Sequence, residues 1–258
     1  MTLEQLQLQT YAVLGLTFLL ATLAGVLFHR SHFCTMGAVS DWVIMGDRTR
    51  GKQWALAVAV AMMGFGLMAW RGWISPLNTI YAGSQLSWLS LFFGGTLFGV
   101  GMVLGSGCPS KSLIRLGGGN LKSLVVLMAM GISALATLRG LTAVWRVNSI
   151  DLLTVGTGPG PFLGQWLGHA SGMTPSWAGG VSACVVSGLL LLWVFKDRQT
   201  LQRSTLFSGA GIGALVVALW WVSGVLGFVQ EHPQTLEPAF LATTSGRMES
   251  MSLTAPVA

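Results

Sequence analysis

Six long apolar runs most constrain what this chain can fold into. Each has about 18 or more predominantly apolar residues, and a helix of about 20 such residues crosses the roughly 30 Å hydrocarbon layer of a bilayer. The runs cover residues 11–28, 53–73, 86–104, 121–138, 177–195 and 207–229. Only 9% of all residues are charged, against roughly 25% in a soluble domain. The sequence therefore predicts an all-α, multi-pass integral membrane protein, with residues 1–258 forming one membrane domain.

The basic residues are unequally shared between the loops that join these runs. If the amino terminus is external, the cytoplasmic loops hold most of them, namely Arg30, Arg48, Arg50, Lys52, Lys111, Arg115, Lys122, Lys196, Arg198 and Arg203. Lysine and arginine gather on the cytoplasmic side of membrane proteins, which favours this orientation. The net charge of +6 thus reflects topology. The basic residues are scattered over loops and do not form one basic face that could bind nucleic acid, so we predict no nucleic-acid partner.

An internal repeat occurs at an offset of 74 residues. The letters TLAGV from Thr22 match TLFGV from Thr96, and each segment reaches a cysteine after seven further residues, at Cys34 and Cys108. The repeat units are predicted to cover about 11–52 and about 86–122. Repeated membrane units are the usual construction of transporters, whose substrate sites lie near the midplane where the repeats meet.

Both repeated cysteines adjoin a sequence that interrupts a plain span. Cys34 is followed by TMGA, and Cys108 lies in GSGCPS from Gly105. Glycine lets the backbone turn, and Pro109 favours the first turn of a new helix. We therefore predict a break and a short re-entrant half-helix over residues 105–115. The free N–H groups and positive dipole end of such a half-helix suit an anion.

Composition also assigns the remaining segments. Residues 139–176 are rich in glycine and proline and are predicted to form an extramembrane loop with short surface helices. The tail, residues 230–258, is mixed and polar, and 248–251 could form a short helix.

Close helix approach is expected at the glycines of two spans, namely Gly94, Gly95, Gly99, Gly101, Gly209, Gly211 and Gly213.

The cysteines allow several interpretations. A free cysteine is ordinarily a small buried hydrophobe. Two at equal repeat positions, each beside a break, favour a substrate role for Cys34 and Cys108, whereas Cys184 lies inside a plain span and is expected to pack. His29, His32 and Cys34 could ligate zinc or copper, but no fourth ligand stands at motif spacing, and we predict no metal and no cofactor. The predicted membrane region contains no Ser-His-Asp set and no pair of carboxylates, so we predict that the chain is not an enzyme.

These motifs resemble those of the YeeE/YedE family of sulfur-transport membrane proteins. The matching segments are RSHFCTMGA from Arg30, GDR from Gly46, FGVGM from Phe98, GSGC from Gly105, LGGGN from Leu116 and ATTSGRMES from Ala242. The resemblance implies an hourglass-shaped bundle in a bacterial inner membrane, whose cysteine thiols hand thiosulfate inward. It further implies that a soluble TusA-like sulfur-carrier protein accepts the cargo. Family members usually continue into a further glycine-cysteine element, so we expect this chain to be truncated or completed by a partner.

The sequence thus predicts a permease for thiosulfate or a related sulfur anion. The predicted transport residues are Cys34, Cys108, Gly105, Gly107 and Arg30. A thiosulfate dianion is costly to bring into low dielectric unless donors and positive charge meet it, and thiols are weak, uncharged donors. Two alternatives stay open: a membrane thiol oxidoreductase, although CxxC is absent, and a soft-metal transporter for copper or zinc.

Overall fold

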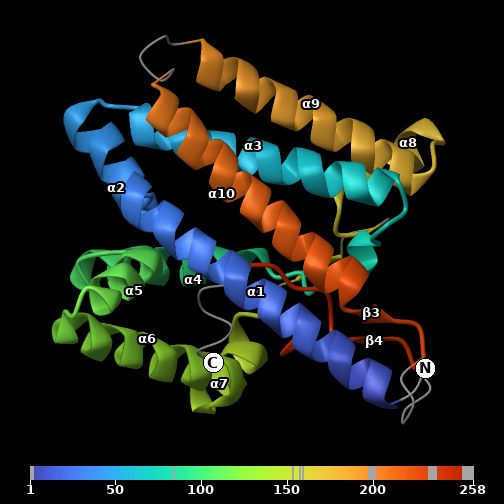
Figure 1. Ribbon diagram of the computed structural model, residues 1–258, viewed down its shortest axis with the longest axis horizontal. Coiled ribbons are helices and arrows are strands. Elements are labelled where there is room, and N and C mark those ends of the chain that lie inside the picture. Colours follow the sequence, from blue (N-terminus) through green and yellow to red (C-terminus); the bar gives the residue numbers. More distant parts are fainter. Residues whose placement is uncertain are drawn as a thin grey trace. The chain divides into compact units, whose positions relative to one another are not determined.

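The architecture is almost entirely helical (Figure 1). This computed structural model describes residues 3–83, 85–152, 154–156, 158, 160–196, 202–231 and 237–251. Within them, six helical segments are long and apolar enough to cross a membrane: Glu4–Met45, Thr49–Trp70, Trp88–Gly117, Leu121–Arg139, Pro175–Phe195 and Arg203–Leu226. Each contains most of one predicted apolar run. The prediction of an all-α, multi-pass membrane protein is confirmed.

The chain packs as two compact units. Among the described residues, the first unit contains those within 3–27, 52–83 and 160–251, and the second contains those within 28–51 and 85–158. Helices α1 (Leu3–Ser31) and α3 (Thr49–Trp70) contribute residues to both. The limits of the predicted single domain and of its repeat units remain predictions.

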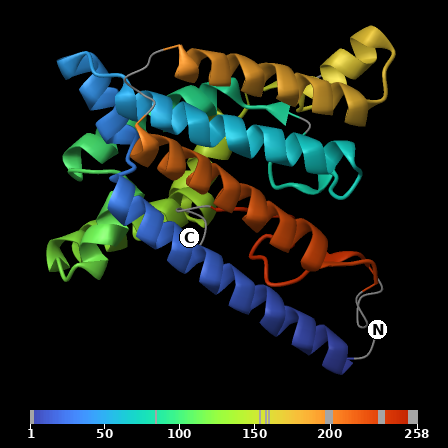
Figure 2. The same cartoon turned by 45° about the horizontal axis from the view of Figure 1, so that its top comes forward.

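In the first unit, α3, α9 (Pro175–Phe195) and α10 (Arg203–Trp221) lie side by side (Figures 1 and 2). Glycine permits the close approach of α10 to α3, as predicted. A Cβ added to Gly209 would lie 2.8 Å from the Gln53 carbonyl oxygen, and one on Gly213 would lie 2.6 Å from that of Ala57. The side-chain amide of Gln53 also donates to Ser208 Oγ at 2.5 Å. Such internal partners are required where no water can satisfy a polar group.

The end of the first unit is extended rather than helical. After α10 a π-helical turn, Val222–Leu226, leads into strand β3 (Phe228–Val229), which pairs antiparallel with β4 (Ala239–Phe240). Met248 then bridges to Thr79 and is only 1% exposed, packed against Gly224. The short helix considered for residues 248–251 was wrong, because this segment is held by strand-like bonds and burial of Met248. A further short helix, α8 (Leu163–Ser171), packs on α9.

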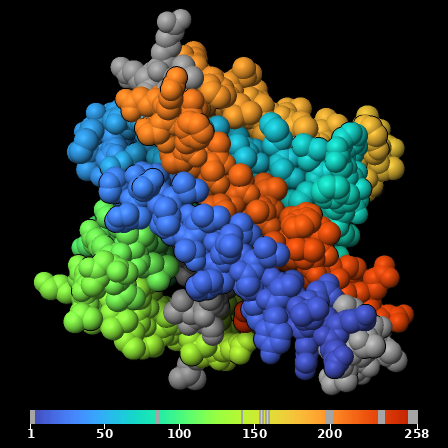
Figure 3. Space-filling model, in the orientation of Figure 1, coloured from blue at the N-terminus to red at the C-terminus, as the bar shows by residue number. Residues whose placement is uncertain are grey.

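The outer side of α1 carries large apolar side chains with no protein cover. Its blue surface is open to view in the space-filling picture (Figure 3). Leu8, Tyr11 and Phe18 are each more than 70% exposed. A surface of this kind would be unfavourable in water. It is what a helix facing lipid presents.

The second unit contains the helices that flank the two repeated cysteines. They are α2 (Thr35–Ser40), a π-helical turn (Asp41–Met45), α4 (Trp88–Leu104), α5 (Pro109–Gly117), α6 (Leu121–Arg139) and α7 (Leu141–Ser149). Strand β1 (Gln85–Leu86) pairs antiparallel with β2 (Val155–Gly156). Helices α5 and α6 form a hairpin, in which Asn120 caps α6 by accepting from the Lys122 N–H. Short helices in 139–176 are thus confirmed, whereas their place outside the membrane remains a prediction.

The glycines of α4 behave differently from those of α10. A Cβ added to Gly94, Gly95, Gly99 or Gly101 would meet no atom within 4 Å. The close helix approach predicted at these four positions is therefore absent from the described part of the chain. The difference follows from packing, since none of the residues of α4 is buried in the protein.

Candidate functional site

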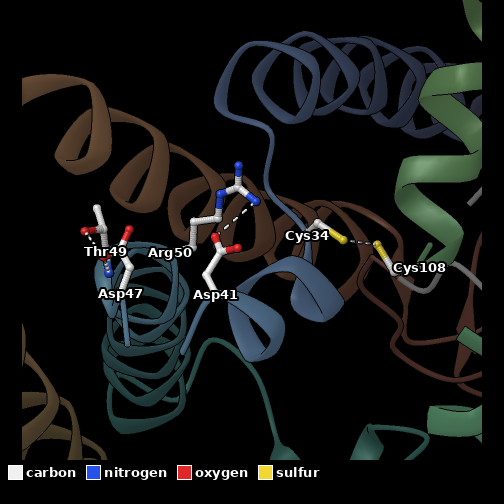
Figure 4. A network of polar contacts seen from close by, with 6 residues as sticks. All are labelled: Cys34, Asp41, Asp47, Thr49, Arg50 and Cys108. Carbon is white, nitrogen blue, oxygen red and sulfur yellow. Dashed lines mark hydrogen bonds and ion pairs between the residues drawn. The ribbon is translucent and has the colours of Figure 1, made fainter. Parts of the chain in front are cut away.

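The thiols of Cys34 and Cys108 meet inside the second unit. Their sulfur atoms lie 3.1 Å apart, and Figure 4 shows the two side chains pointing toward one another. Both residues are buried, and both are free cysteines. Cys108 Sγ also lies 2.9 Å from Ser110 Oγ, at hydrogen-bonding distance. The two thiols singled out by the sequence repeat thus form one contact.

Each cysteine is placed by the same turn of the backbone. The residue two positions earlier is left-handed in both cases, with φ of 49° at His32 and 56° at Ser106. The cysteine itself is extended and is the N-cap of the following helix, α2 or α5. Its carbonyl oxygen accepts the first helical hydrogen bond, from the Ala38 or Ser112 N–H. The predicted break and the short helix after it are confirmed, since α4 ends at Leu104 and α5 begins at Pro109. Re-entry of this helix into the membrane remains a prediction.

Backbone amides of these helix starts lie near the sulfurs. The Gly37 amide is near the Cys34 sulfur, and those of Thr35 and Lys111 are near the Cys108 sulfur. The first N–H groups of a helix have no partner within it, and its dipole is positive at this end. The thiol pair therefore lies where the backbone itself favours an anionic or electron-rich ligand.

The other predicted transport residues have distinct positions. Gly105 and Gly107 close the end of α4, because their N–H groups donate to the carbonyls of Gly101 and Met102 at 2.8 and 3.0 Å. Both belong to the break that delivers Cys108. Arg30 is exposed in the last turn of α1, one residue beyond His29. Substrate contact by these three residues remains a prediction.

A cavity of about 370 Å³ has Cys34 in its lining. Its lining, all from the second unit, is Phe28, His29, His32, Phe33, Cys34, Arg50, Lys111, Ile114 and Arg115. Three of these side chains are cations at neutral pH, two are histidines, and none is a carboxylate. The sequence prediction placed Arg30 at the site and missed Arg50, Lys111 and Arg115. The i, i+4 spacing of Lys111 and Arg115 on the predicted half-helix was the available signal.

An ion pair fixes one of these cations. Arg50 Nη1 lies 3.2 Å from Asp41 Oδ2 (Figure 4). A Cβ added to Gly37 would lie 3.0 Å from the same nitrogen, so the absence of a side chain there leaves room for the guanidinium.

Nearby, Asp47 Oδ1 accepts hydrogen bonds from Thr49 Oγ1 at 2.6 Å and from the Thr49 N–H at 2.9 Å. These bonds hold the pKa of the Asp47 carboxyl below its usual value.

Cys184 belongs to the first unit, on α9. It is exposed and lines a separate apolar groove of about 240 Å³, together with Trp70 and Trp177. The expectation that it packs inside was wrong, because the groove leaves its side of α9 open. Among the described residues, no group of three or more His, Cys, Asp or Glu side chains is arranged to hold a metal ion.

Known proteins that are similar to this chain have descriptions that concern sulfur transport. A family described as sulphur transport matches residues 30–258. The chain is 27% identical over 247 residues to the thiosulfate transporter TsuA of Spirochaeta thermophila, which covers 92% of this chain and 66% of that protein. It is 30% identical over 105 residues to TsuA of Escherichia coli, which covers 41% of this chain and 28% of that protein. The chain therefore spans less than two thirds of the length of either relative. With six candidate spans, a buried thiol pair and a family match over most of its residues, the chain belongs to the sulphur transport (YeeE/YedE) family of membrane proteins.

Proposed function

We propose that this chain forms a pathway for thiosulfate, or a related sulfur anion, across a bacterial inner membrane, and that Cys34 and Cys108 pass the substrate between them. The observation that carries the proposal is the 3.1 Å contact between the two buried thiols. Membership of a sulphur transport family supports a transport role rather than catalysis. The similarity to two thiosulfate transporters supports a sulfur anion as the substrate.

The chemistry of the pair suits this substrate. A dianion loses much of its hydration free energy in a low-dielectric path, so it needs donors along the way. Thiol S–H groups are weak donors and soft partners for the terminal sulfur of thiosulfate. Weak sites in series release a ligand as easily as they bind it, which conduction requires. Two thiols in contact allow the terminal sulfur to leave one as it reaches the other.

A TusA-like soluble sulfur carrier is the proposed acceptor at the cytoplasmic side. The basis for the side is the positive-inside count, since Arg50, Lys111 and Arg115 belong to loops predicted to be cytoplasmic. Purified carrier added inside vesicles should increase the initial rate of thiosulfate entry. A rate independent of the carrier would remove it from the proposal.

The two alternatives differ in what the thiols do. An oxidoreductase would cycle the pair between dithiol and disulfide, whereas a permease keeps both thiols reduced during turnover. A soft-metal transporter needs a ligand group that includes His29 or His32. Contact between Cys34 and Cys108 is also compatible with the redox alternative. The deciding experiment must therefore measure which substrate crosses the membrane.

The test is uptake of radiolabelled thiosulfate by cells that lack their own permease. Cells expressing the chain should accumulate label, and Cys34→Ala or Cys108→Ala should each abolish most of this uptake at equal membrane abundance. Uptake of copper and zinc is measured in the same cells, and the redox state of the thiols is followed by alkylation. Metal uptake without thiosulfate uptake, or parental uptake by both alanine variants, would reject the relay.

A further inference from the structure

We propose that the cavity beside Cys34 is an oxyanion-binding vestibule, which holds the sulfonate group of the substrate while its terminal sulfur engages the Cys34 thiol. This inference rests on the proposed function and adds a second recognition element to it. The thiols would recognise one end of the anion and the vestibule the other. The residues assigned to it are Lys111, Arg115 and Arg50, and His29 and His32 also belong to its lining.

The charge of the lining supports an anion of two negative charges. Lys111, Arg115 and Arg50 each carry a full positive charge at neutral pH. The carboxylate of Asp41, outside the lining, neutralises one of them through its 3.2 Å pair with Arg50. The lining therefore keeps a positive charge of about two, which matches in magnitude the negative charge of a thiosulfate or sulfate dianion. Arginine and lysine donors also match the oxygens of a tetrahedral oxyanion.

The walls of the cavity strengthen that charge. Phe28 and Phe33 lie against each other with ring centroids 5.6 Å apart, and Ile114 adds a third apolar side chain to the lining. Low-dielectric walls focus the field of the cations into the cavity. The volume of about 370 Å³ also admits an anion together with several waters, each of which takes about 30 Å³. A partly hydrated dianion can therefore enter without losing all its water.

Two of the cations are tied to the same break that places Cys108. Arg115 Nη1 donates to the carbonyl oxygen of Ser106 at 3.1 Å. The aliphatic stem of Lys111 lies over Gly107, since a Cβ there would be 3.5 Å from Lys111 Cδ. Cys34 lines the cavity, whereas Cys108 does not. An anion with its oxygens on the cations therefore lies beside Cys34 rather than beside Cys108.

The vestibule defines the substrate class as anions that carry both an oxyanion group and a terminal sulfur. Sulfate has the charge and oxygens but no terminal sulfur, so it should occupy the vestibule and compete without being transported. Hydrosulfide has the sulfur but lacks the oxygens, so it should compete weakly. The selectivity of such a site for thiosulfate over sulfate or hydrosulfide is the difference between the affinities for these anions.

The test is the kinetics of radiolabelled thiosulfate uptake for the parent, Lys111→Gln and Lys111→Arg. Lys111 is exposed, so its exchange leaves the packed thiol pair in place. Loss of one charge should raise KM about fivefold while the maximal rate changes less than about twofold. Sulfate supplied on the side of a vesicle where Lys111 and Arg115 are predicted to lie, the cytoplasmic side, should inhibit thiosulfate transport by the parent and inhibit Lys111→Gln about fivefold more weakly. Lys111→Arg keeps the charge and should return both KM and sulfate inhibition most of the way to the parental values. Arg71→Gln is the control: it removes a cation that lies over the Trp73 ring in the first unit, and it should match the parent.

Equilibrium binding of radiolabelled sulfate to the purified chain in nanodiscs separates this inference from the proposed function. The expected result is saturable binding by the parent and weaker binding by Lys111→Gln. Absence of saturable sulfate binding, or equal binding by both proteins, overturns the vestibule even if thiosulfate is transported. Sulfate binding that depends on Lys111, in a chain that takes up no thiosulfate, would reject the proposed function and leave an oxyanion site. A parental KM for Lys111→Gln likewise overturns the vestibule.

Discussion

His32 and Ser106 adopt the same left-handed backbone conformation at equivalent positions of the two repeats, each two residues before a thiol. Their φ angles are 49° and 56°. A residue with a side chain is uncommon in this region, and holding it there costs on the order of 1 kcal/mol. The turn ends one helix and lets the next begin at the cysteine. The thiol contact therefore depends on two local backbone turns.

Replacement of Ser106 tests this dependence. Ser106→Gly should leave the thermal midpoint unchanged or slightly raised, because glycine reaches φ above zero without strain and the carbonyl that accepts from Arg115 is retained. Ser106→Val should lower the free energy of unfolding by about 1–2 kcal/mol, because a β-branched residue is the least suited to this region. Thermal unfolding of the detergent-solubilised protein measures both. A valine variant as stable as glycine would contradict the role of the turn.

The second prediction separates sulfur contact from simple hydrogen bonding. Cys108→Ser keeps a donor of similar size but lacks the polarisable sulfur, so thiosulfate uptake should fall nearly as far as in Cys108→Ala. Membrane abundance should change by no more than a packing defect of about 1 kcal/mol allows. Cys184→Ala is the matched control, since Cys184 is exposed and lies outside the pair. Parental uptake by Cys108→Ser would show that any donor suffices.

The third prediction concerns the glycine contact of α10 with α3. Gly213→Ala should lower the thermal midpoint although alanine is the better helix former by about 1 kcal/mol. The reason is that the new Cβ would lie 2.6 Å from the carbonyl oxygen of Ala57, a backbone atom that cannot move aside cheaply. Gly188→Ala in α9 is the control, because its Cβ would meet nothing within 4 Å. A midpoint for Gly213→Ala at or above that of the control would refute the contact.

The features that sequence predicted correctly are those set by local chemistry. Long apolar runs identified six spans, because a helix of a given length either crosses the hydrocarbon layer or does not. Glycine, serine and proline between Gly105 and Ser110 identified the break, since they determine where a helix ends and the next begins. The offset of 74 residues identified the two cysteines that prove to be in contact.

The features that sequence missed depend on tertiary structure. The cavity beside Cys34 combines side chains from the end of α1, the start of α3 and α5, which no single motif contains. Residues near Met248 lie beside Thr79 through long-range pairing, which overrides the local helix propensity considered for them. The outward position of Cys184 likewise follows from which helices cover α9. A one-dimensional pattern carries no signal for these contacts.

The last prediction is a pH-dependent contribution of Asp47 to the start of α3. Its carboxylate accepts two hydrogen bonds from Thr49, and they lower its pKa in the folded protein. A lowered folded-state pKa means that the stabilisation is fully present above the unfolded-state value of about 4 and is lost as pH falls through the folded-state value. Replacement of Asp47 by alanine should therefore destabilise the protein at pH 7, with a smaller effect near pH 3.

The measurement is the difference in thermal midpoint between the parent and Asp47→Ala in the same detergent at the two pH values. Loss of a helix-capping side chain costs about 0.5–2 kcal/mol, and the exposure of Asp47 to solvent favours the lower end of that range. A chain of this size should show a decrease of about 1–4 °C at pH 7. Other acidic groups titrate alike in both proteins and cancel in the difference. A difference that is equal at both pH values would mean that the charge of Asp47 contributes nothing, and that only its packing or backbone preference stabilises the helix start.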